Sequence, residues 1–259
     1  DSSGRYCIIF NGEIYNYQQL KDDLSSNEIN FRSQSDTEVL LHLLIKYGAE
    51  ALQKVNGFFA LAFYDKQEKS LFIARDRVGI KPLYYLVDLD RVLFGSEMKA
   101  IMQYGINKDI DFNALYTYLQ LNYIPAPSTI FKSVKKLLPG HFIKIKDGNV
   151  KIGSYYRIPY SEDNYTSDGY EQKKLSSLLE TAVQRRLVGD VPVGSFLSGG
   201  IDSSVIATLA KRHKSDLHTF SIGYKDEKFF DETNYARAVA KKIGSEHTVF
   251  SLTNRDLYE

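Results

Sequence analysis

The chain has 259 residues, of which 43% are hydrophobic and 25% are charged, and its formal net charge is +1. This length and apolar content supply enough material for two hydrophobic cores, and the near-neutral charge gives no reason to expect nucleic acid or an anionic membrane as a partner. The single cysteine excludes an intrachain disulfide framework, and no apolar run reaches the length of a transmembrane helix. We therefore expect a cytoplasmic globular protein.

The first apolar segment, residues 6–16, reads Y-C-I-I-F-N-G-E-I-Y-N. Taken alone, Asn11-Gly12 between apolar runs is typical of the turn of a two-residue β-hairpin. Cys7 stands in the apolar run before it, where we expect a buried, unreactive thiol. The residues after Gly12 belong to a longer motif, which favours a different role for this segment.

A helix is predicted near Asp36, because Ser35 and Glu38 form the capping-box pattern that marks a helix start. Asp36 then lies in the first turn, where its charge stabilises the helix dipole. On these residues alone, a surface carboxylate without a binding role is an equally good interpretation.

Short strands and turns alternate up to Ile152, through the Pro139-Gly140 turn and the Asp147-Gly148 hairpin signal. Residues 159–168 are polar and rich in turn-forming residues, which is typical of a linker. A helix follows, with an apolar face formed by Leu175, Leu178, Leu179, Ala182 and Val183. We expect a first domain over residues 1–158, a linker over 159–168 and a second domain over 169–259.

Residues 195–205 read S-F-L-S-G-G-I-D-S-S-V, an apolar strand that enters two adjacent glycines and continues as a helix with hydroxyl side chains. Glycines let the backbone approach an anion, and the N–H groups at a helix start point toward it. The spacing fits neither a Walker loop nor a G-x-G-x-x-G fingerprint. A phosphate-binding loop of another type is predicted, and an ordinary glycine turn is the alternative.

Strands and helices alternate around this loop. Predicted strands cover residues 193–197, 217–222 and 247–250, and predicted helices begin after Gly200 and near Asp231. This order indicates a parallel α/β sheet. Because ligands bind at the carboxyl ends of the strands in such sheets, we expect residues 198–204 and Ile222 beside one nucleotide.

The S-G-G-I-D-S-S loop resembles the pyrophosphate-binding loop of the ATP pyrophosphatase family, and N-G-E-I-Y-N resembles the glutaminase domain of asparagine synthetases. The resemblance continues through S-D-T-E at 35–38, G-F-F-A-L-A-F-Y-D at 57–65, R-D-R-V-G-I-K-P-L-Y-Y at 75–85 and S-E-M-K-A at 96–100. The chain is thus similar to the glutamine-hydrolysing asparagine synthetase family over nearly its whole length. This resemblance implies an α+β N-terminal-nucleophile glutaminase domain, with layered antiparallel sheets and helices, followed by the start of an α/β parallel-sheet ATP-pyrophosphatase domain.

The resemblance also implies roles for individual residues. Asn11 and Gly12 match the oxyanion hole, and the glutamine site comprises Asn11, Gly12, Glu13 and Asp36, the last two at the α-ammonium group. The ATP site comprises Leu197, Ser198, Gly199, Gly200, Asp202, Ser203 and Ile222, and Asp202 is the expected ligand of Mg²⁺. The family's nucleophile is a cysteine at the N-terminus, whereas residue 1 here is Asp. We therefore expect a fragment truncated at both ends that does not itself hydrolyse glutamine.

The implied reaction is asparagine synthesis, in which aspartate forms an aspartyl-adenylate and ammonia from glutamine displaces AMP. ATP and Mg²⁺ are the expected cofactors, and glutamine, aspartate and ATP are the expected partners, with a homodimer as the assembly to test. Two alternatives stay open. One is a related enzyme that adenylates another carboxylate, such as a β-lactam synthetase-like cyclase, and the other is a non-catalytic protein that binds a nucleotide or an amino acid.

Overall fold

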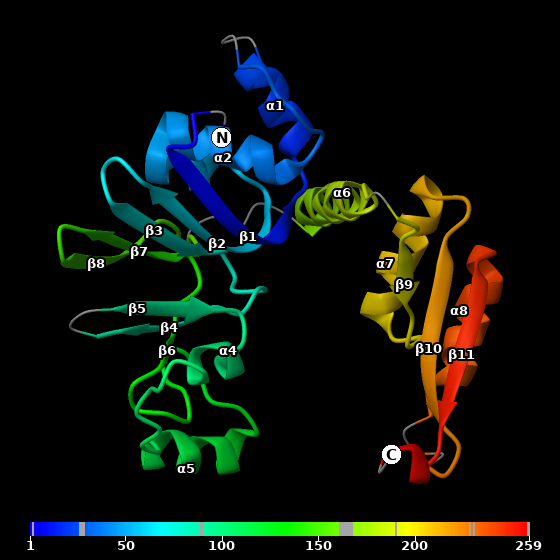
Figure 1. The fold of residues 1–259 in the computed structure, drawn as a ribbon. Helices are drawn as coiled ribbons and strands as arrows, with labels where there is room; N and C mark the ends of the chain where they lie inside the picture. Colours follow the sequence, from blue (N-terminus) through cyan, green and yellow to red (C-terminus); the bar gives the residue numbers. More distant parts are fainter. Residues whose placement is uncertain are drawn as a thin grey trace. The chain divides into compact units, whose positions relative to one another are not determined.

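The computed structural model describes residues 1, 3–25, 29–88, 91–160, 168–189, 191–227, 229 and 231–257. The chain forms two compact units, Asp1–Tyr160 and Ser161–Glu259 (Figure 1). Most of the predicted linker lies outside the described residues, so the boundaries at 158 and 169 stay predictions. Within the described part of the chain, no helix is both long and apolar enough to cross a membrane.

Antiparallel strands and short helices build the first unit. Its strands are β1 (Tyr6–Ile14), β2 (Gly57–Asp65), β3 (Ser70–Arg75), β4 (Tyr84–Val87), β5 (Val92–Gly95), β6 (Lys135–Lys136), β7 (His141–Lys146) and β8 (Asn149–Ser154). Its helices are α1 (Tyr17–Ser25), α2 (Asp36–Tyr47), α3 (Ala51–Lys54), α4 (Met98–Met102) and α5 (Phe112–Leu121), with a 3-10 turn at Gly48–Glu50. One antiparallel sheet has the order β1-β2-β3-β7-β8, and a smaller one has the order β5-β4-β6. The turn between β7 and β8 is the predicted Asp147-Gly148 pair, in which both residues have positive φ.

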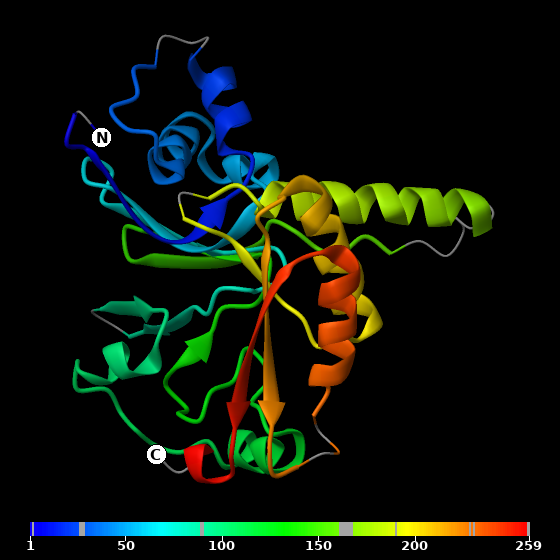
Figure 2. The same cartoon turned by 90° about the vertical axis from the view of Figure 1, so that its right-hand side faces the viewer.

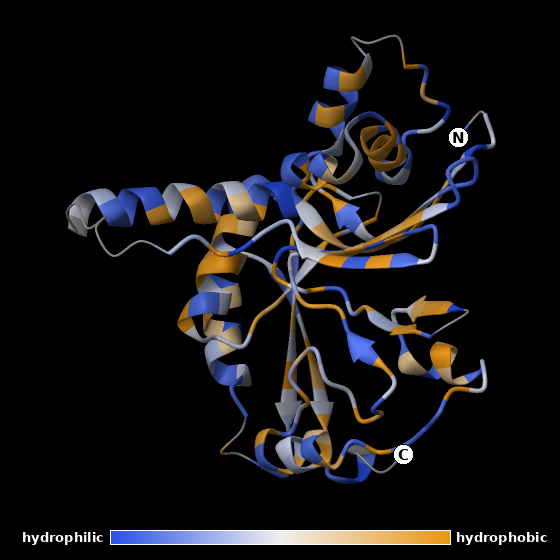
Figure 3. Ribbon diagram, turned by 90° about the vertical axis from the view of Figure 1, so that its left-hand side faces the viewer, coloured by the Kyte–Doolittle hydropathy of each residue, from blue (hydrophilic) through white to orange (hydrophobic). Residues whose placement is uncertain are grey.

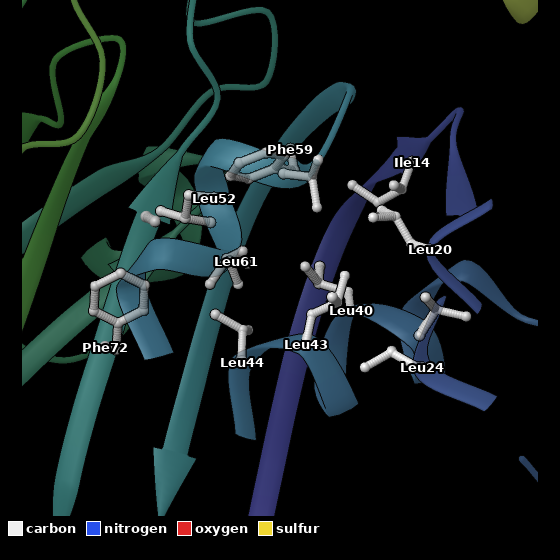
Figure 4. Packing of buried hydrophobic residues seen from close by; sticks show 14 residues of the cluster. Ile14, Leu20, Leu24, Leu40, Leu43, Leu44, Leu52, Phe59, Leu61 and Phe72 are labelled. Carbon is white, nitrogen blue, oxygen red and sulfur yellow. The ribbon is translucent and has the colours of Figure 1, made fainter. Parts of the chain in front are cut away.

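Two of the three hydrophobic cores described in this unit lie on the two faces of the larger sheet, and the third joins β4 and β5 to α4. One core lies between a face of the larger sheet and the helices α1 to α3, and Figure 4 shows Leu40, Leu43 and Leu44 of α2 among the core side chains beside the strands. The other core joins the opposite face of that sheet, through residues such as Ala62 and Ile73, to Leu83 and Leu137 beside strands β4 and β6. Layered antiparallel sheets with covering helices confirm the fold predicted for this part of the chain.

Strand β1 is the edge of its sheet, and its two faces differ. Ile8 and Phe10 pack against the helix-covered core, whereas Cys7 and Ile9 alternate with them and point to the other face. Cys7 is exposed, and Ile9 is 63% exposed. The prediction of a buried thiol was wrong, because the core on this face covers β2, β3 and β7 and does not extend to the edge strand.

Helix α2 begins at Asp36, but its cap differs from a capping box. The Ser35 hydroxyl accepts a hydrogen bond from the Thr37 N–H at 3.1 Å. The Glu38 carboxylate accepts from the N–H groups of Arg32 and Ser33, at 2.9 and 2.7 Å, rather than from Ser35. The predicted reciprocal pair was therefore wrong: Ser35 caps the helix through the Thr37 N–H instead of that of Glu38, and Glu38 accepts from donors in the incoming loop.

Residues 76–82 form a loop held by two charged side chains. The Asp76 carboxylate is 1% exposed. It accepts hydrogen bonds of 2.9–3.3 Å from the N–H groups of Phe59, Val78, Ile80 and Lys81. Arg75 donates to the carbonyls of Gly79, Lys81 and Leu137 at 2.7–2.8 Å. Much of the R-D-R-V-G-I-K-P motif therefore serves to fold its own backbone.

The second unit is a parallel sheet with helices on one face. It contains α6 (Asp168–Arg186), β9 (Gly194–Phe196), α7 (Ile201–His213), β10 (His218–Tyr224), α8 (Thr233–Ile243), β11 (Glu246–Leu252) and a 3-10 turn at Arg255–Leu257. The strand order is β9-β10-β11, and Figure 2 shows β10 and β11 running in the same direction. Leu197 packs with Ala207 of α7 and with Ala236 and Ala240 of α8. The predicted α/β fold is confirmed, with each strand within two residues of its predicted bounds.

Helix α6 departs from the prediction in its burial. Leu179 and Val183 pack against Leu209 and Leu217, but Leu175 and Leu178 are 58% and 60% exposed. Figure 3 shows hydrophobic and hydrophilic residues mixed along this helix. Leu175 lines a groove of about 440 Å³ between α6 and α7, so the predicted apolar face is buried only toward its C-terminal end.

Candidate functional site

Asn11, Gly12 and Glu13 occupy consecutive positions of strand β1. They pair with Ala60, Phe59 and Phe58 of β2, in a register that is unbroken from Tyr6 to Ile14. The hairpin interpretation of Asn11-Gly12 was therefore wrong, because the partner strand comes much later in the chain. Alternation places Gly12 on the face of the helix-covered core and places Asn11 and Glu13 on the opposite face.

Gly12 permits a close approach between β1 and β2. A Cβ atom at this position would overlap the carbonyl oxygen of Phe58 and would lie 2.8 Å from the Phe59 Cα. Gly57 is constrained in the same way by the carbonyl group of Glu13. A side chain at either glycine would push the strands apart, so both glycines fix the end of β1 that carries the candidate site.

Asp36 is connected directly to this end of β1. Its Oδ2 accepts a hydrogen bond of 2.9 Å from the backbone N–H of Ile14, and the residue is half-buried. Asp36 is therefore not a surface carboxylate without contacts. The start of α2 and the end of β1 thus bring Asp36 next to the segment Asn11–Gly12–Glu13, although the two segments are far apart in the sequence.

Ser96 contacts Asn11 and was not singled out as a site residue from the sequence. The Asn11 Nδ2 donates a hydrogen bond of 2.9 Å to the Ser96 hydroxyl, which follows strand β5. The contact takes one of the two amide protons and leaves the other for a ligand. The only available signal was that Ser96 opens the motif S-E-M-K-A.

The end of β1 therefore offers a defined set of polar groups. Asn11 supplies a side-chain N–H, Gly12 supplies a backbone N–H, and Glu13 and Asp36 supply carboxylates. Two N–H donors from adjacent residues are of the kind that binds the oxygen of a tetrahedral intermediate, and carboxylates are of the kind that binds an ammonium group. These assignments to glutamine stay predictions.

The second candidate site begins where β9 passes into helix α7. The Ser198 Oγ lies 3.0 Å from the Ser203 Oγ, and the hydroxyls of Ser203 and Ser204 donate to the Gly200 carbonyl at 3.1 and 2.7 Å. Gly200 is the N-cap of α7 and provides no side-chain cap for the first N–H groups of the helix. Uncapped helical N–H groups beside hydroxyls form an arrangement that suits an anion.

The two glycines of this loop have different structural roles. Gly199 has φ of +88°, and a Cβ atom there would lie 2.5 Å from the Tyr235 Cβ and 2.6 Å from the Ala236 nitrogen of α8. Gly200 has φ of −67°, and the nearest atom to a Cβ would be the Ser198 Oγ at 3.4 Å. The contact with α8 is therefore a structural reason for glycine at position 199, and access for an anion there stays a prediction. Gly200 is the glycine with an open side.

A cavity of about 220 Å³ lies at the carboxyl ends of β9 and β10. Leu197, Ser198 and Ile222 line it, so these three predicted ATP-site residues share one cavity. The other lining residues are Phe196, Phe220, Ser221, Tyr224, Glu232 and Thr233. The predicted residues Gly199, Gly200, Asp202 and Ser203 follow directly in the chain but are not part of this lining. Glu232 and Thr233 were missed, and the available signal was their place at the start of helix α8.

Asp202 is an exposed carboxylate in the first turn of α7. Among the residues that the structure describes, no group of three or more His, Cys, Asp or Glu side chains could hold a metal ion. A metal at Asp202 would therefore need most of its ligands from water and from a bound molecule. Mg²⁺ on nucleotide phosphates has this ligand pattern, so a single carboxylate fits it.

Two family models match the chain. A model described as a glutamine amidotransferase domain matches residues 1–156. The chain belongs to the glutamine amidotransferase domain family. A second model, described as asparagine synthase, matches residues 174–259. The predicted similarity to glutamine-hydrolysing asparagine synthetases is thus confirmed for both parts of the chain.

The names of curated relatives combine asparagine synthetase with glutamine hydrolysis. Asparagine synthetase [glutamine-hydrolyzing] 1 of Bacillus subtilis is 40% identical over 243 residues, which are 93% of this chain and 38% of that protein. A putative asparagine synthetase [glutamine-hydrolyzing] 2 of Methanocaldococcus jannaschii is 37% identical over 261 residues, 97% of this chain and 49% of that protein. The chain therefore spans less than half the length of these relatives. A solved glutamine phosphoribosylpyrophosphate amidotransferase from B. subtilis matches with a TM-score of 0.45 and 15% identity, covering 95% of this chain and 61% of that one.

Proposed function

We propose that the protein containing this chain makes asparagine from aspartate, with ATP as the energy source and glutamine as the nitrogen donor. The observation that carries the proposal is the hydrogen bond from Ile14 to Asp36, since it holds a carboxylate against the strand that presents Asn11, Gly12 and Glu13. The names of the curated relatives support asparagine as the product and glutamine as a substrate. The hydroxyl-rich loop at the start of α7 supports the use of ATP.

In the first unit, the α-ammonium group of glutamine would bind to Glu13 and Asp36. Attack on the carboxamide carbon produces a tetrahedral oxyanion, to which the Asn11 amide and the Gly12 N–H would donate. By family resemblance, the attacking thiolate belongs to a cysteine that precedes this segment. Breaking the C–N bond releases ammonia, and water then hydrolyses the thioester to give glutamate.

In the second unit, the pyrophosphate part of ATP would bind to Ser198, Gly199, Gly200 and Ser203, with the adenosine beside Leu197 and Ile222. The uncapped N–H groups of α7 would bind the negatively charged oxygens. Asp202 would hold Mg²⁺, which when bound shares the charge of the departing pyrophosphate. A carboxylate oxygen of aspartate attacks the α-phosphorus and pyrophosphate leaves. Ammonia then attacks the acyl carbon, and the acyl–oxygen bond breaks to release AMP and asparagine.

An isotope experiment on the whole protein tests this proposal. With glutamine labelled with ¹⁵N in its amide, aspartate and Mg·ATP, we expect labelled asparagine, AMP and pyrophosphate in equal amounts. Exchange of pyrophosphate into ATP that depends on aspartate would support the adenylate. Exchange that depends on a different carboxylate would favour the cyclase-like alternative. ATP binding without AMP release under every condition would contradict the proposal and favour a non-catalytic protein.

A further inference from the structure

A half-buried histidine connects two buried hydroxyl groups next to the loop at residues 198–200. The Nδ1 of His247 in β11 is 2.9 Å from the Thr219 Oγ1, and its Nε2 is 3.3 Å from the Ser221 Oγ. Thr219 is fully buried, and Ser221 is 5% exposed. Both belong to β10 and point to the face of the sheet that helix α8 covers.

Ser221 reaches the loop through Leu197. The Ser221 hydroxyl donates a hydrogen bond to the Leu197 carbonyl, and the Leu197 N–H donates to the Phe220 carbonyl at 2.8 Å. Leu197 is 1% exposed and immediately precedes Ser198. Strand β10 thus holds both backbone polar groups of the residue from which the loop starts.

A count of protons sets the direction of these hydrogen bonds. Ser221 has one hydroxyl proton, which it donates to the Leu197 carbonyl, so the Ser221 Oγ accepts a hydrogen bond from the Nε2–H of His247. In a neutral ring with Nε2–H, the Nδ1 accepts from the Thr219 hydroxyl at 2.9 Å, and the Glu246 carbonyl, at 3.2 Å from the same oxygen, is the more distant of the two acceptors for its single proton. Burial and the nearby positive charge of Arg237 lower the pKa of His247, in agreement with a neutral ring.

We propose that His247 is a positioning residue for the ATP-binding loop: its Nε2–H orients the Ser221 hydroxyl, which holds the Leu197 carbonyl and thereby fixes Ser198, Gly199 and Gly200. This inference rests on the proposed function of the loop as part of an ATP site. Without the imidazole, the Ser221 oxygen loses its donor, and the hydroxyl is free to rotate away from Leu197. The start of the loop would then be held by the Leu197 N–H alone.

The test uses His247→Leu, His247→Gln and Ser221→Ala in the 259-residue chain. Leucine removes both ring nitrogens, whereas glutamine keeps an N–H donor at the position that Nε2 occupies. Backbone amide resonances of Ser198, Gly199 and Gly200 report the loop conformation without any ligand, and calorimetry gives the Kd of Mg·ATP. His218→Gln is the matched control, because His218 lies on the same sheet but is exposed and pairs with Glu246.

We expect His247→Leu and Ser221→Ala each to shift the three loop resonances and to weaken Mg·ATP binding about tenfold. His247→Gln should restore both readouts to within about twofold, and His218→Gln should change neither. The double variant should bind no more weakly than the single ones, because both substitutions break the same series of hydrogen bonds.

Unchanged loop resonances in a folded His247→Leu variant, or additive losses in the double variant, would overturn the positioning role. If His247→Leu does not fold, Ser221→Ala decides in its place, since it removes a single oxygen atom. A chain that binds no ATP, while its loop resonances still respond to His247→Leu, would contradict the proposed ATP site and support the positioning role.

Discussion

The Asp36 carboxylate accepts a hydrogen bond of 2.9 Å from the backbone N–H of Ile14, which connects the first turn of α2 to the last residue of β1. The Oδ2 atom accepts this hydrogen bond. The Oδ1 atom accepts another one, of 3.2 Å, from the Thr37 hydroxyl. Asp36 therefore has a structural contact and, on the proposed function, a ligand contact. The substitution Asp36→Asn keeps an acceptor oxygen for the Ile14 N–H but removes the negative charge. It can therefore separate the structural contact from the ligand contact.

We expect Asp36→Asn to weaken glutamine use by about tenfold to a hundredfold, the value of a hydrogen bond to a charged group. Synthesis from ammonia should stay nearly unchanged, because the second unit receives ammonia in either case. Steady-state assays of the whole protein with glutamine and with ammonium chloride measure both activities.

Asp36→Ala also loses the Ile14 contact and should lower the free energy of unfolding by about 1–2 kcal/mol. An equal loss with both nitrogen donors in the asparagine variant would mean that Asp36 is purely structural.

Ser96→Ala is expected to lower kcat for glutamine about fivefold with little change in KM, because the hydroxyl orients the Asn11 amide rather than binding the substrate. Glutaminase assays of the whole protein measure this effect. Ser96→Thr keeps the hydroxyl and is the control, with activity close to that of the unsubstituted protein. A rise in KM alone would place Ser96 in substrate binding and contradict the positioning of Asn11.

The elements built from neighbouring residues could be predicted from the sequence. The strand, loop and helix around Gly199 and Gly200 lie within a short segment, where apolar period, glycines and hydroxyls give consistent signals. The Asp147-Gly148 hairpin turn could also be predicted, because its signal lies in two adjacent residues. Both of them adopt positive φ, as this type of turn requires. The sequence was sufficient to predict an element wherever the residues that form it are close in the chain.

Contacts between distant segments could not be predicted in this way. Asn11-Gly12 has the local signal of a hairpin turn, and only the presence of strand β2 makes it part of a continuous strand. The Asn11 contact with Ser96 spans 85 residues and depends on how the two sheets pack. Cys7 was expected to be buried because its neighbours are apolar, but burial depends on which strand forms the sheet edge. The sequence alone contains no direct signal for that.

Asp76→Asn should destabilise the first unit by about 3 kcal/mol, because a buried carboxylate that accepts several N–H hydrogen bonds is replaced by a group with one acceptor oxygen and an opposing NH₂. Denaturant unfolding gives the stability, and hydrogen exchange of the Val78, Ile80 and Lys81 amides locates the loss. Asp109→Asn is the control, since Asp109 is exposed, and it should stay within about 0.5 kcal/mol. Similar stability in both variants would show that the loop at 76–82 is held mainly by Arg75.

Acid should weaken the fold through the pair of Arg5 and Asp65. The hydrogen bonds from Arg5, at 2.7 and 2.9 Å, lower the pKa of Asp65 from 3.8 to about 2. Since the folded-state pKa lies below the unfolded value, this contribution to stability is present above about pH 4 and is lost as the pH falls toward 2. The free energy of unfolding, measured between pH 2 and 5, should fall less steeply in Asp65→Asn than in the unsubstituted chain. Identical slopes would mean that Arg5 does not bind Asp65 in solution.

Gly199→Ala and Gly200→Ala form a matched pair that separates folding from anion binding in one loop. At Gly199, φ is +88° and a Cβ atom would meet Tyr235 and Ala236, so alanine should lower stability by about 1–3 kcal/mol. At Gly200, φ is −67° and the atom nearest to an added Cβ is the Ser198 Oγ at 3.4 Å, so stability should change by less than about 0.5 kcal/mol.

The new methyl group of Gly200→Ala should nevertheless weaken Mg·ATP binding about tenfold, because it occupies space near the proposed phosphate position. Thermal melts and calorimetry on the same samples measure both quantities. Full ATP affinity in Gly200→Ala would mean that the phosphates do not approach this side of the loop, and unchanged stability in Gly199→Ala would contradict the close contact with α8.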